Sequence, residues 1–110
     1  MKKENRLKKR KEFNFIFSHG ESISSKNIVL VFLKSKLKKY KVGFSVSKKV
    51  GKAVVRNKVR RRIKEIVRQS CESLKNGFNY IFIAKPCASE ASFEQLKLDI
   101  AFLMNKFNQI

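Results

Sequence analysis

The stretch KKVGKAVVRNKVRRRIKEIVR, residues 48–68, holds ten of the chain's 27 basic side chains and a single acidic one, Glu65. From about Val54 onward its apolar residues recur at i, i+4, i+8 and i+11, namely Val55, Val59, Ile63 and Ile66. This spacing brings them to one side of a helix, so the stretch is predicted to be helical with one buried stripe.

The far side of this predicted helix is cationic. At about 100° per residue, the side chains that line up there are Asn57, Arg61, Lys64 and Arg68, with Arg60 beside them. At the start of the helix the macrodipole is already positive and the first N–H groups lack partners. The cations that crowd this start are Lys48, Lys49, Lys52 and Arg56. A polyanionic nucleic-acid backbone would neutralise this positive charge and accept hydrogen bonds from the unpaired N–H groups. A solvated charged face is the alternative, but such faces mix signs, so the pattern favours nucleic-acid binding.

The distribution of charge agrees with a binding surface. The 110 residues carry a formal net charge of +19, and residues 1–68, with 23 basic and four acidic side chains, account for all of it. General solubility would not require this asymmetry. The length suits a single domain with one core, residues 1–110, and we expect residues 1–8 to form a mobile basic arm.

No apolar run reaches the roughly 18 residues of a membrane span. No signal-peptide core follows the basic N-terminus either. We therefore expect a cytoplasmic protein without a membrane partner. Cys71 and Cys87 lack a CxxC partner or a neighbouring His. This argues against zinc and favours small core residues in a reducing compartment.

Apolar periodicity places the other elements. A short helix is predicted over residues 9–18, ended by His19-Gly20 with a left-handed glycine cap. Strands are predicted over residues 27–33, 40–47 and 78–84, the first two joined by a basic hairpin loop. The pattern SFEQ from Ser92 is a capping box that opens a last, near-neutral packing helix. The class is α+β, a sheet with helices packed on it.

Candidate catalytic groups are sparse. The chain has one His, one Asp and seven Glu, and the acids are scattered singly rather than forming the carboxylate set of a two-metal nuclease. His19 stands beside a glycine at a helix end, which favours a capping or surface role. We predict no catalytic residue and no metal site on the protein. Any phosphodiester chemistry then requires reacting groups from elsewhere.

Three motifs carry a resemblance to a known family. The central one is VGFSVSKKVGKAVVRNKVRRRIKE, residues 42–65. Upstream, RLKK at residues 6–9 precedes Phe13, Ile16-Phe17 and His19-Gly20; downstream, YIFIAK at residues 80–85 precedes Pro86. In order and pattern the chain resembles the protein subunit of bacterial ribonuclease P, a family with an Arg-Asn-Arg motif in its basic helix.

The resemblance implies a fold and a function. The fold would be a small mixed sheet of about four strands with three helices packed on it, the basic helix lying in a left-handed βαβ crossover (ribosomal protein S5 domain 2-like). The function would be that of the non-catalytic subunit of an endoribonuclease that removes the 5′ leader from precursor tRNA. The implied partners are the catalytic RNA and precursor tRNA, with no obligate protein partner. Mg²⁺ would be bound mainly by the RNA.

The resemblance also implies which residues touch each RNA. Catalytic-RNA contacts would come from Lys48, Lys49, Lys52, Arg56, Asn57, Lys58, Arg60, Arg61, Lys64 and Arg68. Leader contacts, in a cleft between the sheet and the first helix, would come from Phe13, Phe17, Val31, Ser45 and Ser47. Two positions depart from the family pattern. Lys58 replaces an arginine and loses its planar fork, and Val31 stands where an aromatic is common.

Two alternatives stay open. Phe13 and Phe17 lie one turn apart and could stack on unpaired bases. On the residues alone, however, they read more readily as core aromatics with Ile16, and only the resemblance favours the cleft. For the whole chain, a structural RNA-binding protein of the ribosome is the alternative function.

Overall fold

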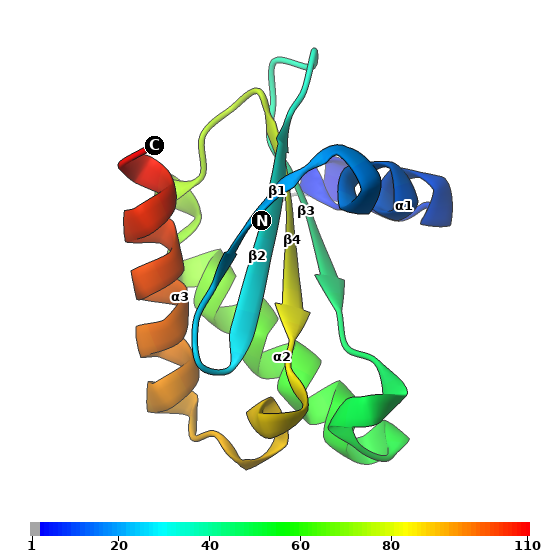
Figure 1. Cartoon of the computed structure of the whole chain (residues 1–110), viewed down its shortest axis with the longest axis vertical. Coiled ribbons are helices and arrows are strands. Elements are labelled where there is room, and N and C mark those ends of the chain that lie inside the picture. Colours follow the sequence, from blue (N-terminus) through cyan, green and yellow to red (C-terminus); the bar gives the residue numbers. More distant parts are fainter. Residues whose placement is uncertain (1–2) are drawn as a thin grey trace.

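The computed structural model describes residues 3–110, apart from the side chains of Lys3 and Cys71. Within these residues it forms three α-helices and four strands, joined by short 3-10 turns (Figure 1). The elements in chain order are η1 (Lys3–Asn5), α1 (Arg10–His19), β1 (Glu21–Ser24), β2 (Ile28–Lys34), β3 (Lys41–Ser45), η2 (Lys48–Val50), α2 (Ala53–Gln69), η3 (Cys71–Ser73), β4 (Phe78–Ala84), η4 (Pro86–Glu90) and α3 (Phe93–Asn108). The predicted α+β class, with three helices on a mixed four-stranded sheet, is confirmed.

The sheet has the strand order β1-β2-β4-β3. β2 is antiparallel to both β1 and β4, whereas β3 is parallel to β4. Parallel neighbours need a crossover connection, and α2 supplies it between β3 and β4. The basic helix is therefore fixed to the sheet at both of its ends.

Helices cover both faces of the sheet. Figure 1 shows α1 on one side of the strands and α3 on the other. The larger core lies under α2 and α3, where Tyr80 and Phe82 of β4 are fully buried. The smaller core lies under α1, where Ile16 packs against Val31 and Ile81. Since β4 is covered on both sides, its sequence is apolar on both faces.

The end of α1 differs from the expected left-handed cap. Gly20 has φ −82° and ψ 167°, which is extended backbone. A Cβ on this residue would lie 2.6 Å from the carbonyl oxygen of Ile16 and 2.8 Å from that of Phe32. Glycine is thus required because β2 passes close to the helix end, and the conformation predicted for it was wrong.

In its described part, residues 3–8, the N-terminal segment lies beside β3. Arg6 forms a parallel bridge with Val42 of β3. The N–H of Leu7 donates to the Val42 carbonyl at 2.8 Å, and the Leu7 side chain is only 7% exposed. The first two residues of the predicted arm lie outside the described part of the chain.

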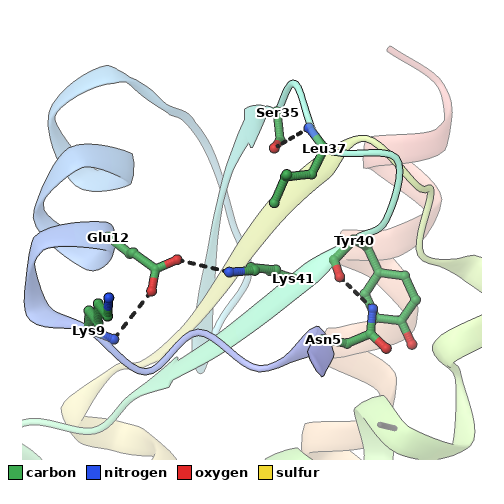
Figure 2. Close-up of polar contacts among 7 residues, drawn as sticks. All are labelled: Asn5, Lys9, Glu12, Ser35, Leu37, Tyr40 and Lys41. Carbon is green, nitrogen blue, oxygen red and sulfur yellow. Dashed lines mark hydrogen bonds and ion pairs between the residues drawn. The ribbon is translucent and has the colours of Figure 1, made fainter. Parts of the chain in front are cut away.

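Polar contacts tie this segment and α1 to the start of β3 (Figure 2). The buried Asn5 side chain donates from Nδ2 to the Tyr40 carbonyl at 2.7 Å. Lys41 of β3 forms an ion pair with Glu12 of α1, with Nζ and Oε2 3.3 Å apart. Glu12 also accepts from the N–H of Lys9 at the helix start. These contacts hold the start of α1 beside β3, while Ile16 further along the helix packs over β2 and β4.

The basic link at residues 34–39 is not a hairpin loop, because β4 lies between β2 and β3. The link instead passes the start of β4. There the N–H of Ser35 donates to the Gly77 carbonyl at 2.7 Å, and the N–H of Gly77 donates to the Lys39 carbonyl at 3.2 Å. Gly77 has φ +86°, a conformation that favours glycine.

Two further local expectations differ. The short strand β1, absent from the predicted strand positions, pairs antiparallel with β2. It has only one partly buried residue, Ile23, so its sequence carries little apolar signal. Cys87, expected in the core, is exposed, and its Sγ lies 3.3 Å from the Lys26 carbonyl.

Candidate nucleic-acid interface

The far side of α2 is a cationic face open to solvent. Val59, Ile63, Ile66 and Val67 are buried, which confirms the predicted stripe except that Val55, at its start, is only partly buried. The exposed side chains of the predicted interface are Asn57, Lys58, Arg61 and Arg68, and the partly buried ones are Arg56, Arg60 and Lys64. The helical periodicity therefore predicted correctly which apolar residues of α2 are buried and which side of the helix carries the cations.

The approach to α2 adds cations where the helix is already positive. Lys48, Lys49 and Lys52 are all exposed. The first turn of α2 contains no acidic residue, and the N-cap Lys52 makes no side-chain capping bond. Gly51 makes the sharp entry possible, since its φ of +153° is a conformation that other residues rarely adopt. This end of the helix suits an anion.

A groove of about 230 Å³ opens where the N-terminal segment, α1, β3 and α2 meet. Its lining combines four cations with two aromatic rings: Arg6, Leu7, Lys8, Phe13, Val42, Phe44, Arg60 and Lys64. We call it the α1/β3 groove. Aromatic faces within a basic trough are the arrangement that holds single-stranded nucleic acid.

Lys64 is a partly buried cation of this groove. Its Nζ lies 5.8 Å from the centroid of the Phe44 ring, within range of a cation–π contact. Burial lowers the Lys64 pKa, and the nearby charges of Arg6 and Arg60 lower it further. A phosphate placed among these three cations would relieve their mutual repulsion.

The structure separates the apolar residues of α1 by role. Ile16 is 1% exposed and belongs to the core, whereas Phe17 is 43% exposed. Phe13 is partly buried and lines the groove, and its ring centroid is 6.3 Å from that of Phe17. The two rings are therefore neighbours on α1.

The other predicted leader residues are not all brought to this surface. Val31 is 7% exposed and packs in the small core beneath α1, so its side chain does not line the groove. Ser45 is partly buried at the end of β3, and Ser47 is exposed just before η2.

Two polar contacts shape the face of α2. Arg68 is engaged with Glu65, with Nη2 and Oε1 2.6 Å apart, and this hydrogen bond lowers the pKa of the Glu65 carboxyl. Arg60 donates from Nη1 to Oδ1 of Asn57 at 3.1 Å. Arg60, which lines the groove, is thus partly ordered before any ligand binds.

Residues 1–108 match the family model described as Ribonuclease P. The chain belongs to the ribonuclease P protein family. It is 42% identical over 101 residues to the ribonuclease P protein component of Clostridioides difficile, a match covering 91% of this chain and 89% of the relative. It is 43% identical over 107 residues to that of Bacillus velezensis, covering 96% and 91%.

Solved structures agree. The Staphylococcus aureus RNase P protein is similar with a TM-score of 0.85 at 28% identity, covering 93% of this chain and 94% of that one. The Thermotoga maritima RNase P protein gives 0.82 at 30% identity, covering 92% and 96%. As a ribonuclease P protein component, the chain takes part in tRNA processing, and its partner is the ribonuclease P RNA.

Sequence reasoning left three charged or aromatic groove residues of this ribonuclease P protein out of its site set, Arg6, Lys8 and Phe44, together with the apolar Leu7 and Val42. Phe44 carried a signal, because it alternates with Val42 on β3. Arg6 and Lys8 belong to a motif that resembles the family, but a run of basic residues does not reveal that it will dock beside a strand.

Within the described part of the ribonuclease P protein, no three His, Cys, Asp or Glu side chains are grouped so that they could hold a metal ion. None of its described helices has the length and apolar character that crossing a membrane requires. His19 is exposed, stacks on Phe15 at a centroid distance of 4.3 Å, and lies at the surface as expected.

Proposed function

We propose that this ribonuclease P protein holds two RNAs side by side, the catalytic RNA on the basic face of α2 and the 5′ leader of precursor tRNA in the α1/β3 groove. The observation that carries the proposal is that Arg60 and Lys64 border both surfaces. They line the groove, and they also line a shallow depression on α2 with Asn57 and Arg61. A leader in the groove would then lie directly beside the bound catalytic RNA.

The groove suits an unpaired strand. Stacking on an aromatic side chain contributes about 1–3 kcal/mol per base with little sequence preference. Phe13 and Phe44 offer rings within the groove, and the more exposed Phe17 continues the aromatic surface along α1. Arg6, Lys8 and Lys64 surround the same space with positive charge. Leaders of different sequence could bind here because neither contact reads a base edge.

The face of α2 suits a folded RNA. Its exposed lysines and arginines, with those of the approach at residues 48–52, can each contact a phosphate. Six to ten such contacts would make affinity fall by roughly 10³ to 10⁵ between 50 and 200 mM salt. Lys58 contributes charge without the bidentate geometry of an arginine.

The bond chemistry is assigned to the RNA in this proposal. The protein's single aspartate and seven glutamates are dispersed along the sequence. We propose that the catalytic Mg²⁺ ions are held mainly by the catalytic RNA, which the protein positions against its substrate. We expect the complex to act in the cytoplasm, where bacterial precursor tRNA is made.

Cleavage assays test the proposal. Purified protein freed of RNA should leave precursor tRNA intact, and adding the cognate catalytic RNA at low Mg²⁺ should give leader removal faster than the RNA alone. Cleavage by the protein without RNA would overturn the assignment of the bond chemistry to the RNA. Co-sedimentation with ribosomal subunits and no effect on leader removal would favour a structural ribosomal role instead.

A further inference from the structure

A second cavity, of about 470 Å³, lies at the other end of the sheet. Its walls come from the ends of α1 and β2, the start of β4 and the C-terminal turn of α3. It shares no residue with the α1/β3 groove. Because Lys34 pairs with Phe78 at this end of β4, whereas α2 follows the opposite end of β3, the cavity is also separate from the approach to α2. We call it the β2/α3 cavity.

The floor of the β2/α3 cavity is aromatic. The ring of Phe107 packs edge-on against Phe32 at a centroid distance of 4.9 Å and against Phe78 at 5.2 Å. Phe32 and Phe107 are buried, while Phe78 keeps part of its surface exposed. A flat apolar group entering the cavity would therefore meet aromatic surface.

The rim of the cavity is charged. Lys34 and Lys75 line it, and Nζ of Lys75 lies 5.6 Å from the Phe107 ring centroid. The hydrogen bond between Ser35 and Gly77 holds the two lysine-bearing segments together. An aromatic floor under two ammonium groups is complementary to an anion that carries a flat ring.

The remaining polar groups suit the edge of a base. His19 and Glu21 line the same cavity. Nδ1 of His19 lies 3.0 Å from the Phe15 carbonyl, so when Nδ1 donates there, Nε2 is left to accept from a ligand. The Glu21 carboxylate accepts from N–H groups and disfavours a phosphate beside it. The cavity thus combines cations that attract a phosphate with groups that can hydrogen-bond to a base.

We propose that the β2/α3 cavity binds one unpaired nucleotide of a partner RNA, its base on the partly exposed ring of Phe78 and its phosphate at Lys34 and Lys75. The site would anchor RNA at the end of the sheet remote from the start of α2. The inference rests on the proposed function only for the source of the nucleotide, and binding to the protein alone is tested separately from cleavage.

The first experiment titrates the isotope-labelled protein with AMP, with UMP and with inorganic phosphate, following backbone amide shifts by NMR. Both nucleotides should shift the amides of Leu33, Phe78 and Ile110, and inorganic phosphate at the same concentration should shift them much less. Equal shifts with phosphate would show a simple anion site, and no shift with any probe would show an empty cavity. Either outcome overturns the proposal.

Matched double variants separate the cavity from general charge. Lys34→Gln with Lys75→Gln should weaken AMP binding roughly five- to tenfold, since two charge contacts are lost. Lys36→Gln with Lys38→Gln removes the same charge from the neighbouring link but touches no cavity wall, and should change AMP affinity less than about twofold. Equal losses in the two pairs would overturn the assignment.

Phe78→Leu keeps apolar volume but removes the ring, and should weaken AMP several-fold without loss of the folded spectrum. A photoreactive side chain at Ile110 then identifies the source, with catalytic RNA and precursor tRNA offered separately and together. A crosslink to an unpaired nucleotide of either RNA supports the proposal and names the partner. AMP binding without any RNA crosslink would assign the cavity to a free nucleotide and overturn it.

Discussion

The ring of Phe13 occupies the space that a side chain on residue 43 would need. A Cβ on Gly43 would lie 2.5 Å from Cζ and 2.7 Å from Cε1 of that ring. Gly43 does not have a positive φ, so glycine is required here for close approach and not for conformation. The bare backbone of β3 therefore positions the Phe13 ring at the α1/β3 groove.

Gly43→Ala should push Phe13 and α1 away from β3. The added methyl group should lower the free energy of unfolding by about 1–3 kcal/mol, as overpacking does. Affinity for leader-bearing precursor tRNA should fall more than affinity for the catalytic RNA, because the groove is changed and the face of α2 is not. Denaturant unfolding and binding assays measure both quantities. A variant with unaltered stability and leader affinity would contradict the role given to this contact.

Phe17→Ala should weaken binding of precursor tRNA with a long leader by roughly 1–3 kcal/mol, the contribution of one stacked base. Mature tRNA should be affected little. Phe15→Ala is the matched control, since Phe15 is another exposed ring of α1, 57% exposed, that stacks on His19, whereas Phe17 neighbours the groove ring of Phe13. Equal losses for the two variants, or for the two tRNAs, would argue against leader stacking at Phe17.

Lys58→Ala combined with Arg61→Ala should weaken catalytic-RNA binding and reduce the slope of log affinity against log salt by roughly one to two units. Both side chains are exposed on α2. Lys97→Ala with Lys106→Ala removes the same charge from exposed positions of α3 and should leave the slope nearly unchanged. Filter binding over a salt series distinguishes the two pairs, and the same slope in both would place the RNA elsewhere.

The buried hydroxyl of Tyr80 should make the protein less stable at high pH. Burial raises the pKa of its hydroxyl from 10 to about 12. Its hydroxyl is also held at Lys75, whose N–H donates to it at 2.8 Å. At a pH between 10 and about 12, the unfolded chain has lost the Tyr80 proton and the folded chain keeps it. The free energy of unfolding should therefore fall as pH rises, by up to about 1.4 kcal/mol per pH unit.

Tyr80→Phe is the control for that prediction. The variant should be less stable below pH 10, because the Lys75 N–H loses its acceptor. The difference in unfolding free energy between the wild type and this variant isolates the tyrosine from the lysines that titrate in the same range. A difference that stays constant from pH 9 to 12 would contradict the buried, protonated hydroxyl.

The helices were predictable because their information is local. Val59, Ile63 and Ile66 recur at helical spacing and are buried as expected. Ser92 and Gln95 form the capping box in the structure that their spacing indicated. The mixed sheet with its crossover, by contrast, was anticipated only through the resemblance to a family.

Contacts between distant segments were not predictable from the residues. The apolar patterns of β2 and β3 are the same whether the strands pair or are separated by β4, so the link at residues 34–39 was misread as a hairpin loop. Leu7 is a single apolar residue within a basic run, yet it anchors the N-terminal segment to β3. The groove needs both contacts, which is why Arg6 and Phe44 were missed while the cations of α2 were found.

The insertion of β4 between β2 and β3 sets an order of events during synthesis. Apart from its bridge to Arg6, β3 has no strand to pair with until residues 78–84 have left the ribosome, although residues 1–68, with 23 of the 27 basic side chains, have by then already been made. During that interval we expect the nascent chain to be a strongly basic polypeptide without its final fold, close to a large excess of ribosomal RNA. It would bind its cognate RNA selectively only after its final third has been translated.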